Sequence, residues 1–160
     1  MNVLVLCTGN SARSILLESI LSHCSDGRIS AYSAGSHPAG KVNPGALAQL
    51  KAVGLPDTGY SSKNWDVFAK PNAPEMDLVV TVCGNARDET CPVWLGAPVS
   101  AHWGVDDPAL VTEPHAAVVD AFSKAYDELR KYADAFLSLK FEDMDRQSLQ
   151  KAVNTIGEMS

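Results

Sequence analysis

The chain has 160 residues, of which 46% are hydrophobic and 20% are charged, and its formal net charge at pH 7 is -6. This composition is typical of one compact domain with a hydrophobic core. The negative charge and the lack of a lysine- and arginine-rich run argue against nucleic-acid binding. No apolar stretch approaches membrane-spanning length, and no signal-peptide pattern is visible. We expect a cytoplasmic protein without a membrane segment, whose four cysteines are reduced.

Strand-like and helix-like patterns alternate along the chain. Strands are expected at residues 2–6, 28–33, 76–82 and, more weakly, 98–103. Helices are expected at residues 14–24, 44–53, around 65–69, and over the long amphipathic stretch 115–139. This alternation predicts an α/β fold, a single-domain parallel sheet of about four strands with helices on both faces.

The tail after the long helical pattern is expected to extend the domain rather than to form another one. Met144, Leu149, Val153 and Ile156 have the spacing of an amphipathic helix. We assign residues 1–140 to the main domain and 141–160 to a helical extension packed on it. No internal repeat or linker is visible.

The most informative motif follows the first strand. Cys7 ends the apolar run, and Arg13 and Ser14 stand where the first helix begins. A loop between a strand and a helix directs its N–H groups toward an anion at the positive end of the helix dipole. The dipole and the guanidinium should lower the pKa of Cys7 and favour its thiolate. We therefore expect Cys7 to be a nucleophile that faces a bound tetrahedral oxyanion.

The other loop residues support an oxyanion-binding role. Gly9 permits close approach of the backbone, and Asn10 tolerates the left-handed conformation that tight loops require. Arg13 can bind two oxygens as a planar fork, and Ser14 can donate a hydrogen bond to the Cys7 sulfur. The motif lacks the Gly-Lys-Ser/Thr ending of a nucleotide-triphosphate loop. The expected oxyanion loop comprises Thr8, Gly9, Asn10, Ser11, Ala12 and Arg13.

Two further cysteines follow the third expected strand. Cys83 ends that strand, and Cys91 lies beyond a polar stretch of seven intervening residues. Zinc binding by these cysteines and His102 is one alternative, but the spacing is not that of a zinc knuckle. A second alternative is that both cysteines merely pack in the protein interior. This alternative is poor for Cys91, because Cys91 lies in a polar loop. A redox role accounts for both.

A third motif, His102-Trp-Gly-Val-Asp-Asp-Pro108, follows the last expected strand. An Asp-Pro pair such as Asp107-Pro108 is common in polar turns, which is the simplest interpretation. The presence of the Cys7 loop favours a catalytic role for Asp107 instead. Asp106 is its neighbour.

The Cys7-x5-Arg13 loop resembles that of low-molecular-weight tyrosine phosphatases and of the arsenate reductases built on the same fold. Cys83 and Cys91 resemble the later cysteines of the thioredoxin-coupled reductases, which plain phosphatases of this fold lack. The resemblance runs from Met1 to about Leu139. It implies that Asn10 braces the loop and that Asp107 is a general acid. Alanine follows Pro108, where the phosphatases present an aromatic side chain to the substrate ring.

The resemblance implies an arsenate reductase that acts in arsenic detoxification through three cysteines. Cys7 attacks arsenate, Cys83 attacks the Cys7 sulfur and releases arsenite, and Cys91 then displaces Cys7 to leave a Cys83–Cys91 disulfide. Thioredoxin would reset the enzyme, and a glutaredoxin/glutathione route stays open because relatives usually have one residue fewer between the two cysteines. No flavin, nicotinamide or metal cofactor is required.

Potassium is bound in some of these reductases by residues that match Asn10, Glu18 and Ser33. Lys63 stands near the remaining carboxylate ligand, and its ammonium can replace the cation, so we expect no metal.

Two alternatives stay open. One is a low-molecular-weight phosphatase that hydrolyses phosphomonoesters with Cys7, Arg13 and Asp107, since phosphate and arsenate share shape and charge. The other is a non-catalytic arsenic- or metal-binding module that uses the three cysteines, although Arg13 and Asp107 do not help to hold a soft metal.

Overall fold

The sheet is built from four parallel strands. The computed structural model describes residues 1–84, 94, 96 and 98–159. The strand order is β2–β1–β3–β4, and every neighbouring pair is parallel. The expected α/β fold with a four-stranded parallel sheet is therefore confirmed. The strands are β1 (Asn2–Leu6), β2 (Ser30–Ala34), β3 (Leu78–Thr81) and β4 (Val99–His102).

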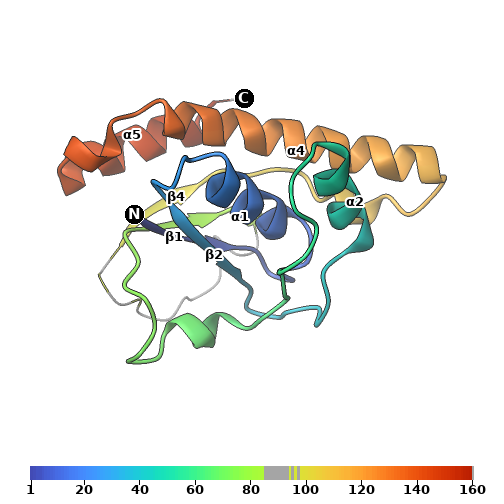
Figure 1. Cartoon of the computed structure of the whole chain (residues 1–160), viewed down its shortest axis with the longest axis horizontal. Helices are drawn as coiled ribbons and strands as arrows, with labels where there is room; N and C mark the ends of the chain where they lie inside the picture. The colour runs from blue at the N-terminus through green and yellow to red at the C-terminus, as the bar shows by residue number, and fades with distance from the viewer. Residues whose placement is uncertain (85–93, 95, 97, 160) are drawn as a thin grey trace.

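The described α-helices gather on one side of this sheet, and the 3-10 helix η1 lies on the other (Figure 1). None of the helices in the described ranges is both long and apolar enough to cross a membrane. The α-helices are α1 (Arg13–His23), α2 (Pro44–Ala52), α4 (His115–Leu137) and α5 (Arg146–Gly157). The 3-10 helices are η1 (Trp65–Phe68), η2 (Pro108–Leu110) and η3 (Phe141–Asp143).

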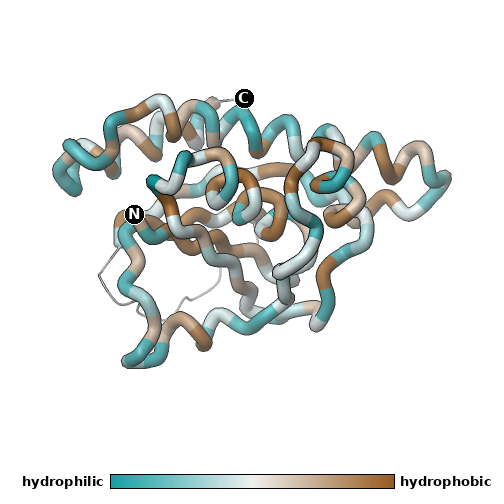
Figure 2. The backbone as a smooth tube through the Cα atoms, in the orientation of Figure 1, coloured by the Kyte–Doolittle hydropathy of each residue, from teal (hydrophilic) through white to brown (hydrophobic). Residues whose placement is uncertain are grey.

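Side chains of β1 point alternately to the two faces of the sheet, so the strand contributes to two cores. Val3 and Val5 face the α-helices, where α1 is buried between the sheet and α4 (Figure 2). Leu4 and Leu6 face the opposite side. There the aromatic rings of Trp65 and Trp94 meet edge to face at 6.2 Å, and Tyr32 packs against Phe68 at 5.5 Å.

The register between β1 and β3 determines which residues lie together at the carboxyl edge of the sheet. Leu6 pairs with Thr81, so the residues that follow β1 and β3 emerge side by side at the carboxyl edge of the sheet. Cys7 and Cys83 therefore come from neighbouring strands. Ligands of parallel sheets bind at this edge.

The C-terminal residues pack on the same sheet as the rest of the chain. The indole nitrogen of Trp103, which follows β4, donates to the carbonyl of Val153 in α5 at 3.2 Å. Phe141 stacks on Phe136 of α4 with ring centroids 4.8 Å apart. Residues 141–159 thus share the core of the main domain.

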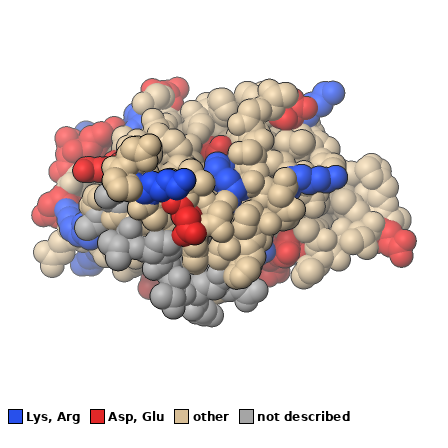
Figure 3. Space-filling view, turned by 90° about the horizontal axis from the view of Figure 1, so that it is seen from below, with Lys and Arg blue, Asp and Glu red and all other residues tan. Residues whose placement is uncertain are grey.

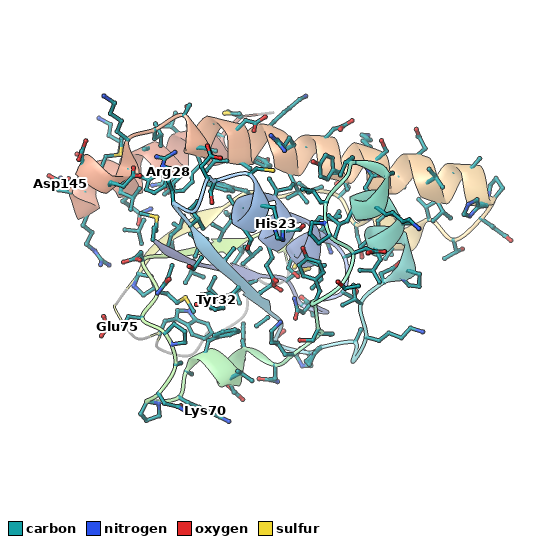
Figure 4. All side chains as sticks on the ribbon, in the orientation of Figure 1. His23, Arg28, Tyr32, Lys70, Glu75 and Asp145 are labelled. Carbon is teal, nitrogen blue, oxygen red and sulfur yellow. The ribbon has the colours of Figure 1, made fainter. Side chains whose placement is uncertain are left out.

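Arg28 binds the beginning of this C-terminal segment through several contacts (Figure 4). Its guanidinium lies 4.1 Å above the ring of Phe141 and donates two hydrogen bonds to the Glu142 carboxylate, at 2.7 and 2.8 Å. It also donates to the carbonyls of Leu137 and Leu139 at the end of α4, at 2.8 and 2.6 Å. The Arg28 side chain therefore provides hydrogen-bond donors for carbonyl groups at the end of α4 and orients the segment that follows.

The Arg28–Glu142 pair predicts a pH-dependent stability. Hydrogen bonding from Arg28 lowers the pKa of Glu142 to about 2. A carboxyl whose pKa is lower in the folded state stabilises the fold above its unfolded pKa and loses this contribution as pH falls through its folded pKa. We expect Glu142→Gln to lower the free energy of unfolding near pH 7, and this difference from wild type to shrink between about pH 4.3 and pH 2. Urea denaturation over a pH series measures it.

Asp143→Asn is the matched control, because Asp143 is an exposed neighbour with no ion pair among the described residues. It should leave the pH dependence of stability nearly unchanged. A Glu142→Gln effect that stays constant down to pH 2 would contradict the ion-pair account.

Candidate active site

The carbonyl oxygens of the loop after β1 accept hydrogen bonds from a neighbouring segment of the chain. Backbone N–H groups of the segment 37–43 donate to the carbonyls of Thr8, Gly9 and Ser11 at 2.8–3.0 Å. With its carbonyls bound on the outside, the loop has N–H groups left for Cys7 and for an anion, and Gly9 N–H binds the Cys7 sulfur. This is the arrangement expected of an oxyanion-binding loop at the N-terminus of α1.

Gly35 lets the end of β2 approach the loop. A Cβ atom at this position would lie 2.4 Å from the carbonyl oxygen of Thr8 and 2.6 Å from that of Cys7. The Cys7 N–H also donates to the carbonyl of Ala34 at 3.2 Å. Only glycine fits here without displacing the loop. In the sequence, the Ala34-Gly35 pair after the second expected strand is the only signal of this close approach.

Asn10 braces the loop from below. It is fully buried, and its φ of 45° lies in the left-handed region, as its position in the motif suggested. Its side-chain amide donates to the hydroxyls of Ser14 at 2.8 Å and Ser33 at 3.0 Å, and its side-chain oxygen accepts from Lys63 N–H at 2.9 Å. The hydroxyl of Ser14 accepts this hydrogen bond from Asn10, and no bond from it to Cys7 is present among the described residues.

Two half-buried charged groups, Glu18 and Lys63, continue this network. The Ser33 hydroxyl donates to the Glu18 carboxylate. Burial raises the pKa of Glu18, while the Ser33 hydrogen bond and the charge of Lys63 oppose that rise. Burial lowers the pKa of Lys63, and the charge of Glu18 opposes it. Over the described ranges no group of three or more His, Cys, Asp and Glu side chains is arranged to hold a metal ion.

Arg13 connects the loop with Asp107. One guanidinium nitrogen donates to the carbonyl of Val105 at 2.8 Å, and the other lies 3.5 Å from the Asp107 carboxylate. The Asp107 carboxylate also caps η2 by accepting from Ala109 N–H at 3.0 Å. The Arg13 Nε is buried and has no hydrogen-bond partner among the described residues. A buried donor without a partner costs about 1–3 kcal/mol, so this N–H is suited to an incoming oxyanion.

Cys7 and Cys83 are in contact at the base of the loop. Their residues are 6% and 4% exposed and belong to one core cluster, and the Cys83 thiol interacts with Cys7 closely enough to raise its pKa. Thr8 holds Cys83 as well: its N–H donates to the Cys83 sulfur at 3.3 Å, and its hydroxyl lies 3.6 Å from the same atom. Sequence reasoning placed both cysteines at strand ends but did not find the role of Thr8. Cys91 lies outside the described residues.

The expected lowering of the Cys7 pKa is contradicted in this arrangement. The hydrogen bond with Cys83 raises the pKa of Cys7, and burial raises it further. The Arg13 charge and the Gly9 N–H lower it, as expected, but they do not prevail. The physical reason is that the interaction with Cys83 and the loss of water on burial both favour the protonated Cys7 thiol over its thiolate.

The fourth cysteine is remote from this site. Cys24 ends α1 and is half-buried, and its sulfur accepts a hydrogen bond from Arg130 at 3.0 Å. His102, at the end of β4, is hydrogen-bonded through Nδ1 to the hydroxyl of Thr81 at 2.8 Å. The alternative zinc site with Cys83 and Cys91 falls partly outside the described residues.

The sequence and fold define the family of this chain. A sequence model of the low molecular weight phosphotyrosine protein phosphatase family matches residues 2–154, so the chain belongs to that family. Within it, the chain is similar to arsenate reductases. That of Halalkalibacterium halodurans is 34% identical over 82% of this chain and 91% of the relative. That of Bacillus subtilis is 35% identical over 78% and 86%.

Solved structures share the fold at lower identity. An arsenate reductase in its oxidized state matches with a TM-score of 0.69 at 23% identity, over 86% of this chain and 96% of that chain. The tyrosine phosphatase Wzb of Escherichia coli K30, in complex with sulphate, matches with a TM-score of 0.64 at 18% identity, over 85% and 95%. A thioredoxin-dependent arsenate reductase of Corynebacterium glutamicum matches with a TM-score of 0.54 at 23% identity, over 83% and 61%. The fold therefore serves both reductases and phosphatases.

The thiol contact predicts how Cys7 responds to a substitution at its neighbour. Replacing Cys83 by serine removes the sulfur that raises the pKa of Cys7, while Arg13 and Gly9 continue to lower it. We expect Cys83→Ser to move the pH midpoint of Cys7 alkylation downward, because a thiolate is the reacting form. Iodoacetamide labelling over a pH series, with the site assigned by mass spectrometry, measures the midpoint.

Cys24→Ser serves as the control, since Cys24 lies at the far end of α1 beside Arg130. It should not move the Cys7 midpoint. An unchanged or higher midpoint in Cys83→Ser would show that the contact between the thiols does not control the reactivity of Cys7.

Proposed function

We propose that this chain is an arsenate reductase that converts arsenate to arsenite with protein thiols as the electron source. The observation that carries the proposal is the contact between Cys7 and Cys83 at the base of an oxyanion loop. A hydrolase of this fold needs one nucleophile, whereas a reductase needs a second thiol within reach of the first. Relatives named as arsenate reductases, at 34–35% identity over most of the chain, support it.

The first step forms a bond between sulfur and arsenic. Arsenate lies in the loop from Thr8 to Arg13, with its oxygens bound by backbone N–H groups and by the Arg13 guanidinium. The Cys7 thiolate attacks arsenic, and an oxygen departs with a proton from Asp107 as general acid. The 3.5 Å distance between the Arg13 guanidinium and the Asp107 carboxylate supports these two roles, because the proton donor must act beside the bound anion.

The second step reduces arsenic. Cys83, which touches Cys7, attacks the Cys7 sulfur, and the electron pair of the sulfur–arsenic bond remains on arsenic as arsenite leaves. Cys91 then attacks Cys83, releases Cys7 as a thiolate, and leaves a Cys83–Cys91 disulfide. Thioredoxin, or glutaredoxin with glutathione, reduces this disulfide. Each cycle therefore consumes two electrons from an external thiol donor, and no flavin, nicotinamide or resident metal is required in the chain.

Lys63 is proposed to supply the positive charge beneath the loop. Burial raises the pKa of the half-buried Glu18, and the Lys63 ammonium opposes that rise. The backbone N–H of Lys63 donates to the side-chain oxygen of Asn10. Phosphate binding by the wild type should therefore be the same in potassium and tetramethylammonium chloride. Lys63→Asp should weaken phosphate binding about 10–100-fold in tetramethylammonium, the range for residues that support primary ligands, and potassium should restore much of it.

The control for Lys63→Asp is Lys70→Asp, because Lys70 lies on the exposed turn after η1 (Figure 4). It should bind phosphate like the wild type in both salts. Calorimetry gives the affinities. Wild-type binding that requires potassium would show that a cation, rather than Lys63, completes this site.

Substitution of the thiols separates reduction from phosphatase activity. Cys83→Ser should abolish multiple-turnover production of arsenite but leave hydrolysis of para-nitrophenyl phosphate nearly intact, because hydrolysis uses only Cys7, Arg13 and Asp107. Cys7→Ser should abolish both, since serine without a dedicated base is a far weaker nucleophile. Cys91→Ser should release one equivalent of arsenite and then stop. Arsenite assays with thioredoxin and with glutaredoxin/glutathione, beside a phosphatase assay, provide the measurement.

Cys24→Ser should retain both activities. A wild type that hydrolyses phosphotyrosine well and makes no arsenite with any thiol donor would establish the phosphatase alternative. Full activity of Cys83→Ser with glutathione would refute the relay.

A further inference from the structure

The pair Cys7 and Cys83 is assembled in the reduced protein, independently of any arsenic adduct. The two residues leave neighbouring paired strands and pack in one core cluster, and the N–H of Thr8, next to Cys7, donates to the Cys83 sulfur at 3.3 Å. Oxidation of Cys7 by any two-electron oxidant therefore creates an electrophilic sulfur directly beside a thiol. We propose that this pair also reduces small hydroperoxides, an activity that goes beyond arsenate reduction and needs neither arsenate nor Cys91.

The chemistry requires two thiols and one hydroperoxide. The Cys7 thiolate attacks one peroxide oxygen, the oxygen–oxygen bond breaks, and the other oxygen leaves as hydroxide, which takes up the proton that Cys7 released. Cys7 is then a sulfenic acid. The Cys83 sulfur attacks the Cys7 sulfur, and the sulfenic oxygen leaves as water with the Cys83 proton. Two thiols lose two electrons, hydrogen peroxide becomes two waters, and an external dithiol reduces the Cys7–Cys83 disulfide.

Arg13 is placed to assist the first of these steps. Its buried Nε–H has no partner among the described residues, and the residue lies at the N-terminus of α1 in the loop that begins with Cys7. Negative charge develops on the departing oxygen during the cleavage, and a preorganised guanidinium stabilises such charge. The same donor serves arsenate in the proposed reduction. Inorganic phosphate, which fits the same loop, should therefore compete with hydrogen peroxide at Cys7.

Burial of the two sulfurs defines the class of substrate. Cys7 is 6% exposed and Cys83 is 4% exposed, so only a small oxidant can reach the reacting sulfur. Hydrogen peroxide and short alkyl hydroperoxides meet this requirement, whereas a bulky hydroperoxide such as cumene hydroperoxide does not. We expect peroxide consumption to follow the order hydrogen peroxide, then tert-butyl hydroperoxide, then cumene hydroperoxide.

The experiment is hydrogen peroxide consumption by the full chain with dithiothreitol as the reductant and without arsenate. Wild type and Cys91→Ser should both turn over repeatedly. Peptide mapping after brief oxidation should find a Cys7–Cys83 disulfide in Cys91→Ser, whereas in wild type Cys91 can convert it to Cys83–Cys91. Cys7→Ser should consume peroxide no faster than dithiothreitol alone. Saturating phosphate should slow the wild type. Consumption equal to that of Cys7→Ser, or oxidation to a Cys7 sulfinic acid without a disulfide, would overturn the proposal.

Cys83→Ser and Cys24→Ser form the matched pair of variants. In Cys83→Ser the first oxidation should be as fast as in wild type or faster at neutral pH, because the group that raises the Cys7 pKa is gone. When it is oxidised without dithiothreitol, its product should be Cys7 sulfenic or sulfinic acid rather than a disulfide, and with dithiothreitol its turnover should be slower than that of wild type because the resolving thiol is gone. Cys24→Ser should behave as wild type. A Cys83→Ser variant that still turns over at the wild-type rate would show that Cys83 is not the resolving thiol, and phosphate binding by each variant confirms that its loop is folded.

Discussion

Parallel pairing of β1 with β3 is the constraint on which the site depends. Leu6 lies beside Thr81 in this register, so the chain leaves both strands at the same level of the carboxyl edge. Cys7 follows at once, and Cys83 follows two residues after β3 ends. A shift of one residue in a strand moves every side chain to the opposite face, so the contact between the sulfurs requires this register. The apolar residues that fix the register in the two cores therefore also fix the chemistry.

The loop from Thr8 to Arg13, the candidate oxyanion-binding loop, is shaped by polar groups outside it. Its carbonyls are bound by the segment 37–43, Gly35 provides the space for that approach, and Asn10 joins it to α1 and β2. Buried polar groups that lack partners are costly, so this network has one satisfied arrangement and resists alternatives. The Arg13 Nε is the exception among the described residues, and it belongs to the loop that we propose binds the oxyanion. On the face viewed from below, by contrast, acidic and basic side chains are scattered among other residues (Figure 3).

Much of the fold follows from the sequence because each element has a strong local signal. The apolar run before Cys7 gave β1 with its observed bounds, and Asn43 followed by Pro44 marked the start of α2, where Asn43 accepts from Gly45 N–H. The expected strand at 76–82 is shorter in the structure, Leu78–Thr81, because hydrophobicity alone does not mark where pairing ends. The loop motif located Cys7 and Arg13. The sequence motif could not reveal contacts between distant segments. These are the approach of Gly35 to the loop, the hydrogen bond from Thr8 to Cys83, and the hydrogen bond from Arg13 to the Val105 carbonyl.

The missed contact between the sulfurs changes the account of reactivity. Local reasoning considers the helix dipole and Arg13, both of which favour the Cys7 thiolate, whereas the neighbouring strand supplies a thiol that opposes it. A nucleophilic thiol that works alone reacts well when its pKa is low, as long as its thiolate stays nucleophilic enough. In the proposed relay, however, Cys83 must later attack the Cys7 sulfur, so the two thiols have to stay close together. The raised pKa of Cys7 is thus the electrostatic consequence of keeping the second thiol in place. Arg13 and the Gly9 N–H offset part of this rise. In the proposed mechanism the same loop binds the anion, so the groups that would bind the substrate also favour the reactive thiolate.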